Sequence, residues 1–221
     1  MRGGQGQKNL RCALSGIVRR KNLEFFDSSA TLDCMSGRLA KEIGGTLARS
    51  EAPELGPGPR SGVQTMAALD RMLEGSFQHT QVPTSQQRMI RALLLLWNDH
   101  LDAAHGIVQE MDGPDAAFIH GIMHRREPDY DNAKYWFQRV GSHPVFLEIA
   151  RKVESIQGAQ AQRGLLKRLA SNGKWKPNNF IDACEQAATD PGASAETQLL
   201  RQVQRIEIQA LMDWLVSSGN S

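Results

Sequence analysis

The chain has 221 residues, and 40% hydrophobic and 23% charged side chains with a formal net charge of +2 are typical of a globular protein with one main domain. The longest apolar run covers only residues 92–97. A membrane-spanning helix needs roughly 20 apolar residues, so the sequence predicts no transmembrane helix.

The distribution of charged residues and of cysteines bears on the binding partners and on the cellular compartment. Residues 1–60 contain ten basic and six acidic side chains, which leaves the rest of the chain slightly acidic. A nucleic-acid partner is therefore disfavoured, because such binding needs lysine and arginine clustered on one face. The three cysteines form no Cys-x-x-Cys pair, and no secretory signal pattern opens the chain. These features predict a cytoplasmic protein with reduced thiols.

Residues 1–60 show little periodicity and end in a segment rich in proline and glycine that includes Gly56-Pro57-Gly58-Pro59. Such residues interrupt regular structure. The sequence predicts that residues 1–60 are a weakly ordered extension and linker that adds little stability, and that residues 61–221 form the folded domain.

From Val63 onward the apolar residues recur at helical spacing. A first helix is expected up to the glycine at position 75, and a second from Thr84 to Trp97. Thr84 and Gln87 have the spacing of a capping box, in which each side chain bonds the backbone of the other. Asn98 or Asp99 is expected to cap a further helix that carries His105 on its apolar face.

The segment after Pro114 predicts a helix with two different faces. Its apolar side chains fall on one side, whereas small residues and histidines alternate along the other because successive residues advance by roughly 100°. The first face comprises Phe118, Ile119, Ile122 and Met123, and the second comprises Ala117, His120, Gly121 and His124.

The rest of the chain continues the helical pattern. A helix capped by Asp129 or Asp131 is expected to bury Ala133, Trp136, Phe137 and Val140. Four more follow, around residues 144–156, 165–169, 180–187 and 195–216, and Asn172-Gly173 ends the second of these. No alternating strand pattern occurs after residue 60. The predicted fold class is therefore all-α.

Two of the helix pairs repeat at an offset of about thirty residues, because Asp99-x3-Ala103 matches Asp129-x3-Ala133. The segment Asp129-Tyr130-Asp131-Asn132-Ala133-Lys134-Tyr135-Trp136-Phe137 is similar to the second helix of Sel-like repeats, and the pairs resemble tetratricopeptide hairpins. This resemblance covers about a quarter of the chain. It implies a right-handed stack of helical hairpins.

The phrases WNDHLDAAH, HGIMHRREPD and YWFQRVGSHP also resemble segments of a family of uncharacterised bacterial proteins. No activity is associated with that family, so the resemblance implies none here. It supports a domain that begins near residue 63.

One pattern predicts metal chemistry. His120 and His124 are one helical turn apart, so both imidazoles can reach a single zinc or iron ion. His105 is the third predicted ligand, and further ligands could come from His100, Asp99, Asp102, Glu127 or Asp129. Gly121 stands where zinc proteases of the His-Glu-x-x-His type have glutamate, so that class is not indicated. The corresponding function is a metal-dependent hydrolase or oxygenase.

Two other interpretations compete with the metal site, and both leave the protein without a cofactor. Ala117 and Gly121 could mark a close helix crossing where the histidines, including His105, are structural. Alternatively, His120, His124, Arg125 and Arg126 could line a surface that binds a peptide, a protein or a small anionic ligand. This helical binding domain is the first hypothesis. The sequence identifies no catalytic residue, so enzyme activity stays open.

Overall fold

A computed structural model describes residues 39–48, 51–78, 80–158, 160–189 and 195–218. The regular elements of the described chain are helices apart from one two-stranded sheet, which confirms the all-α class. Its elements are a helix over residues 39–48, α2 (Met66–Phe77), α3 (Thr84–Trp97), α4 (Leu101–Val108), α5 (Pro114–Arg126), α6 (Tyr130–Val140), α7 (Val145–Glu154), α8 (Gln160–Leu169), β1 (Ala170–Ser171), β2 (Lys174–Trp175), α9 (Pro177–Ala188) and α10 (Ala195–Ser217).

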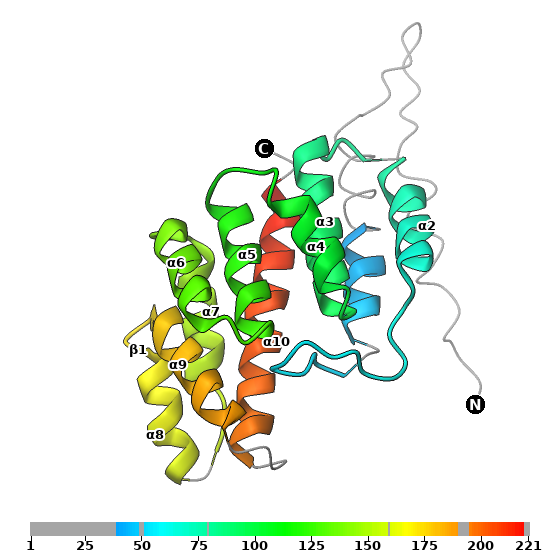
Figure 1. Cartoon of the computed structure of the whole chain (residues 1–221). Helices are drawn as coiled ribbons and strands as arrows, with labels where there is room; N and C mark the ends of the chain where they lie inside the picture. The colour runs from blue at the N-terminus through cyan, green and yellow to red at the C-terminus, as the bar shows by residue number, and fades with distance from the viewer. Residues whose placement is uncertain (1–38, 49–50, 79, 159, 190–194, 219–221) are drawn as a thin grey trace, which may run out of the picture.

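The long helix α10 runs through the middle of the molecule (Figure 1). Helices α6 to α9 lie on one side of it, and α2 to α4 with the helix over residues 39–48 lie on the other. Helix α10 packs against α3, α7 and α9, while α5 packs against α3, α4 and α6. Consecutive helices thus pair as α3 with α4 and α5 with α6, whereas the wider stack of hairpin repeats stays a prediction.

The residues at the helix ends explain several boundaries. Asp129 caps α6 by accepting a hydrogen bond from the Asn132 backbone N–H, as one of the two predicted alternatives had it. The predicted capping box at Thr84 is wrong, because Thr84 is already helical and Pro83 precedes it without a side-chain cap. The predicted caps Asn98 and Asp99 are also wrong, since His100 directly precedes α4.

Residues 39–48 and Leu55 pack against the rest of the described fold, which differs from the weakly ordered extension predicted for residues 1–60. Leu39, Ile43 and Leu47 lie one helical turn apart and are all buried in the core. Arg60 binds the Asp99 carboxylate through its side chain, with Nε 3.1 Å from Oδ2. The predicted extension over residues 1–38 lies outside the described residues.

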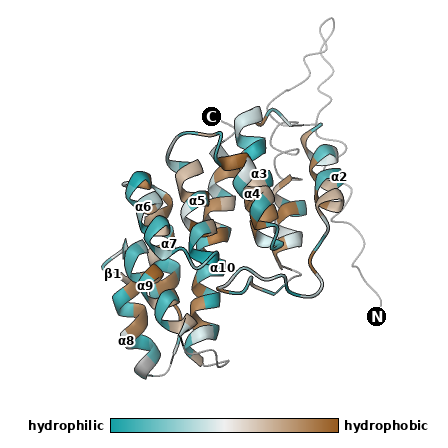
Figure 2. Ribbon diagram, in the orientation of Figure 1, coloured by the Kyte–Doolittle hydropathy of each residue, from teal (hydrophilic) through white to brown (hydrophobic). Residues whose placement is uncertain are grey.

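Helix α5 is buried on all sides, so the predicted face of small residues and histidines lies inside the protein, as does the apolar face. Every residue from Ala116 to Arg126 is buried. Figure 2 shows both hydrophilic and hydrophobic residues along α5. Its buried polar side chains are His120, His124, Arg125 and Arg126. A helix that is surrounded by protein must satisfy each polar side chain inside the fold.

The expectation of no strand after residue 60 is wrong at one place. Strands β1 and β2 pair in antiparallel fashion, with Ala170 opposite Trp175. The two residues between them, Asn172 and Gly173, have φ of 54° and 69°. An Asn-Gly pair readily adopts such angles, so this dipeptide forms a tight hairpin rather than only ending a helix. Within the described chain, no helix combines the length and apolarity needed to cross a membrane.

Candidate metal centre

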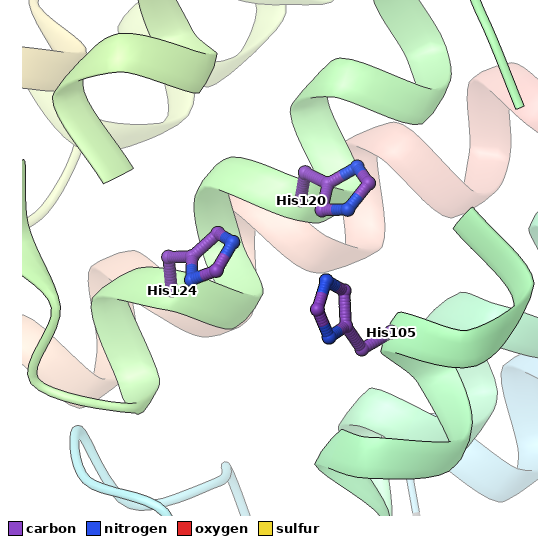
Figure 3. A group of neighbouring side chains, drawn as sticks. All are labelled: His105, His120 and His124. Atoms are coloured by element: carbon purple, nitrogen blue, oxygen red, sulfur yellow. The ribbon is translucent and has the colours of Figure 1, made fainter. Parts of the chain in front are cut away.

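Helices α4 and α5 bring three histidines together. His105 lies on α4, and His120 and His124 lie one turn apart on α5. One nitrogen from each ring lies within 4.8 Å of the corresponding nitrogens of the other two. Figure 3 shows that each ring turns a nitrogen toward the space between the three side chains. The structure therefore assembles the three predicted ligands.

The spacing is close to what a metal ion requires. Two nitrogens that are each roughly 2.0–2.1 Å from a tetrahedral zinc ion lie about 3.3 Å apart. The three nitrogens lie within 4.8 Å of one another, and the three rings have centroid separations of 5.2, 5.5 and 5.8 Å, so the nitrogens would have to move closer together around a bound ion. Three histidines also leave room for a fourth ligand, as catalytic zinc sites do.

The indole of Trp136 fixes the ring of His120. The two rings stack in parallel, with centroids 3.9 Å apart and an interplanar angle of 4°. Trp136 is only partly buried, so the prediction that it lies fully in the core is corrected. Among the described residues, Nδ1 of His120 is buried without a hydrogen-bond partner. This imidazole is thus rigidly held and has a nitrogen that the fold does not satisfy.

Burial keeps His120 neutral. It is only 1% exposed, and burial lowers its pKa to about 4, while electrostatic repulsion between His120 and the neighbouring His105 and His124 rings acts in the same direction. Only the neutral imidazole can donate a lone pair to a metal. His120 is therefore ready to bind a metal near neutral pH.

His124 lies beside carboxylates. Its Nδ1 is 3.4 Å from Oε2 of Glu127 and 3.7 Å from Oδ2 of Asp129, and the Asn132 amide nitrogen lies 3.2 and 3.3 Å from the two ring nitrogens. Burial lowers the pKa of His124, Asp129 opposes this shift, and His105 adds to it. The imidazole is thus neutral as well, with acidic groups on one flank.

The further ligands suggested by the sequence separate into two groups. The first group comprises Asp102, Glu127 and Asp129. Burial raises the pKa of Glu127, His105 lowers it, and the negative charges of Asp102 and Asp129 raise it further. These carboxylates add negative charge where a cation would bind. His100 and Asp99 are engaged elsewhere, His100 with the Gln64 carbonyl and Asp99 with two arginines.

Arg125 and Arg126 point into the protein, so they do not form the predicted ligand-binding surface with His120 and His124. Both arginines are 0% exposed. Arg125 makes a two-pronged ion pair with Glu207 of α10, at 3.2 and 2.5 Å, and its guanidinium lies over the Phe180 ring. Arg126 binds Asp99 at 2.7 Å. Their charges are already neutralised inside the fold and offer nothing to an anionic ligand.

The expected close helix crossing is present. A Cβ atom added at Gly121 would lie 2.6 Å from the Phe137 ring of α6. Glycine is thus needed where α5 and α6 touch, and this crossing holds the histidine helix in place. The crossing and the histidine cluster coexist, because Gly121 contacts α6 while His105 reaches the cluster from α4.

Two partners of the site were not predicted from the sequence. Trp136 was assigned to the core, and nothing local indicated its stack on His120. Glu207 was not identified as the partner of Arg125, because the pair is 82 residues apart. The one feature of the sequence that could have indicated this partner is that Glu207 is flanked by apolar residues on the long terminal helix.

Neither a protein-family model, nor a curated protein, nor a solved structure matches this chain.

Proposed function

We propose that this protein binds a divalent transition-metal ion through His105, His120 and His124 and is a metal-dependent enzyme. The observation that carries the proposal is the meeting of three imidazole nitrogens within 4.8 Å on two helices. Two of these imidazoles have a lowered pKa and are neutral at pH 7, as metal ligands must be.

The donor set favours zinc over iron. Non-haem iron oxygenases use two histidines and one carboxylate, whereas three histidines with an open position are typical of catalytic zinc. A zinc ion held by His105, His120 and His124 would lower the pKa of a bound water to about 7 and would so supply hydroxide at neutral pH. The favoured class is accordingly a hydrolase, and an oxygenase with bound iron is the alternative.

The first test is the metal content of protein produced without a histidine tag. We expect about one equivalent of zinc after purification, or tight uptake of one equivalent by chelator-treated protein. Single substitutions His105→Ala, His120→Ala and His124→Ala should each remove the tight site. His100→Ala is the matched control, because His100 directly precedes the helix that carries His105 but contacts the Gln64 carbonyl and not the histidine cluster.

The stacking of His120 on Trp136 allows metal binding to be followed independently by tryptophan fluorescence. A paramagnetic ion such as Co²⁺ bound to His120 should quench the fluorescence of the Trp136 indole, because the centroids of the His120 and Trp136 rings are only 3.9 Å apart. We expect saturable quenching in the wild type and its loss in Trp136→Phe at unchanged metal stoichiometry. Protein that neither retains metal nor responds to zinc or Co²⁺ would contradict the proposal.

A further inference from the structure

The turn that follows α5 places a glutamate where helix stability does not call for one. Glu127 is the residue that directly follows α5, after His124, Arg125 and Arg126 in its last turn. The carboxyl end of a helix carries partial negative charge, so an acidic side chain there is unfavourable for the helix itself. Among the described residues, no Lys or Arg forms an ion pair with Glu127, and the titratable side chain that its carboxylate contacts within 4 Å is the imidazole of His124.

Oε2 of Glu127 lies 3.4 Å from Nδ1 of His124, and a ring that donates from Nδ1 accepts at Nε2. The Asn132 amide nitrogen lies 3.2 Å from Nε2, a position from which it can donate to that acceptor until a metal takes its place, and 3.3 Å from Nδ1. Figure 3 shows a His124 nitrogen turned toward the other two histidines. Asp129 is farther away, and it already caps α6 through the backbone N–H and the side chain of Asn132.

We infer that Glu127 is a positioning residue of the metal centre: its carboxylate accepts the Nδ1 proton of His124 and fixes the tautomer that turns Nε2 to the metal. This inference rests on the proposed metal-binding function. Histidine ligands of metals usually donate their second nitrogen to such a carboxylate, which sets the ring orientation and raises the basicity of the ligand.

The test compares zinc affinity, measured by competition with a chromophoric chelator, across variants of the acidic turn. Loss of an outer carboxylate typically weakens metal binding about 10–100-fold, which is the effect expected for Glu127→Ala. Glu127→Gln keeps an acceptor oxygen and should recover part of the affinity. Asp131→Asn is the matched control, because Asp131 is acidic and exposed on the first turn of α6.

A second measurement separates positioning from a general structural effect. The visible spectrum of the Co²⁺-loaded protein reports the ligand field, and we expect Glu127→Ala to shift it while the melting temperature of metal-free protein stays near wild type. Wild-type affinity and an unchanged Co²⁺ spectrum in Glu127→Ala would overturn the inference. So would a loss as large as that of His105→Ala, which would make Glu127 a direct ligand. Failure of the metal proposal itself appears differently, as absence of binding by the wild type.

Discussion

At the scale of single residues, buried charge is concentrated at the end of α5. Arg125 and Arg126 are both fully buried, and each is paired with a carboxylate from a distant part of the chain. Burial of Glu207 raises its pKa, although Arg125 opposes this shift. A buried pair of this kind adds little net stability, but each member depends strongly on the other.

We therefore expect Arg125→Met to lower the free energy of unfolding by about 3–5 kcal/mol, because Glu207 would stay buried without its partner. The double variant Arg125→Met/Glu207→Leu should recover much of this loss. Denaturant unfolding measures both. Glu148→Gln is the control, since its i,i+4 pair with Lys152 is exposed and should matter by less than about 1 kcal/mol. A double variant no more stable than the single one would contradict the expectation.

At the scale of elements, the helix over residues 39–48 contributes to the core. Ile43 is 2% exposed and lies among the buried apolar residues. Ile43→Ala should lower the free energy of unfolding by about 2–5 kcal/mol, whereas exposed Lys41→Ala should be near neutral. Chemical denaturation distinguishes the two. Equal stability of both variants would restore the view that the first sixty residues add little.

The crossing of α5 and α6 gives a second prediction at this scale. Gly121→Ala should destabilise the protein by about 1–3 kcal/mol, because the added methyl group would overlap the Phe137 ring. Gly164→Ala in α8 is the control. Its Cβ would meet nothing within 4 Å, so better helix propensity should stabilise the protein by up to about 1 kcal/mol. Thermal denaturation of the two variants checks that their effects have opposite signs.

At the scale of the whole molecule, the buried histidines make stability depend on pH. His120 has a folded pKa of about 4, below the ordinary value of 6.5. Between these two values, His120 is protonated in the unfolded chain but neutral in the folded chain. The contribution of His120 to the free energy of unfolding is therefore greatest above pH 6.5 and declines as the pH falls toward 4. The slope is up to about 1.4 kcal/mol per pH unit for each such histidine. His124 shifts in the same direction.

Denaturant unfolding in the presence of a chelator, repeated across this pH range, measures the effect. We expect His120→Gln to have a shallower pH dependence than the wild type. The difference between the wild type and this variant reports the titration of His120 alone. Glu127 and Glu207 are present in both proteins, and their raised pKa values change the stability with pH in the opposite direction. Parallel curves for the two proteins would show that His120 does not titrate in this way.

The sequence by itself determined the helical class and the face shared by His120 and His124. Both follow from periodicity along one helix, which depends only on neighbouring residues. Local spacing also placed Gly121 at a close crossing. The same local reasoning failed at Asn172-Gly173, because an Asn-Gly pair suits both a helix end and a hairpin turn. The hairpin-repeat architecture and the family resemblance stay predictions.

Only the tertiary structure decided what surrounds that helix. It turned Arg125 and Arg126 inward, since Glu207 and Asp99 lie across the core and not nearby in the sequence. It also brought residues 39–48 into the core, and it placed His105 beside His120 and His124 while His100 contacts the Gln64 carbonyl. These outcomes depend on contacts between distant segments, whose energies have no signature in local periodicity. The candidate metal centre is therefore a property of how α4 and α5 pack, although its residues were visible in the sequence.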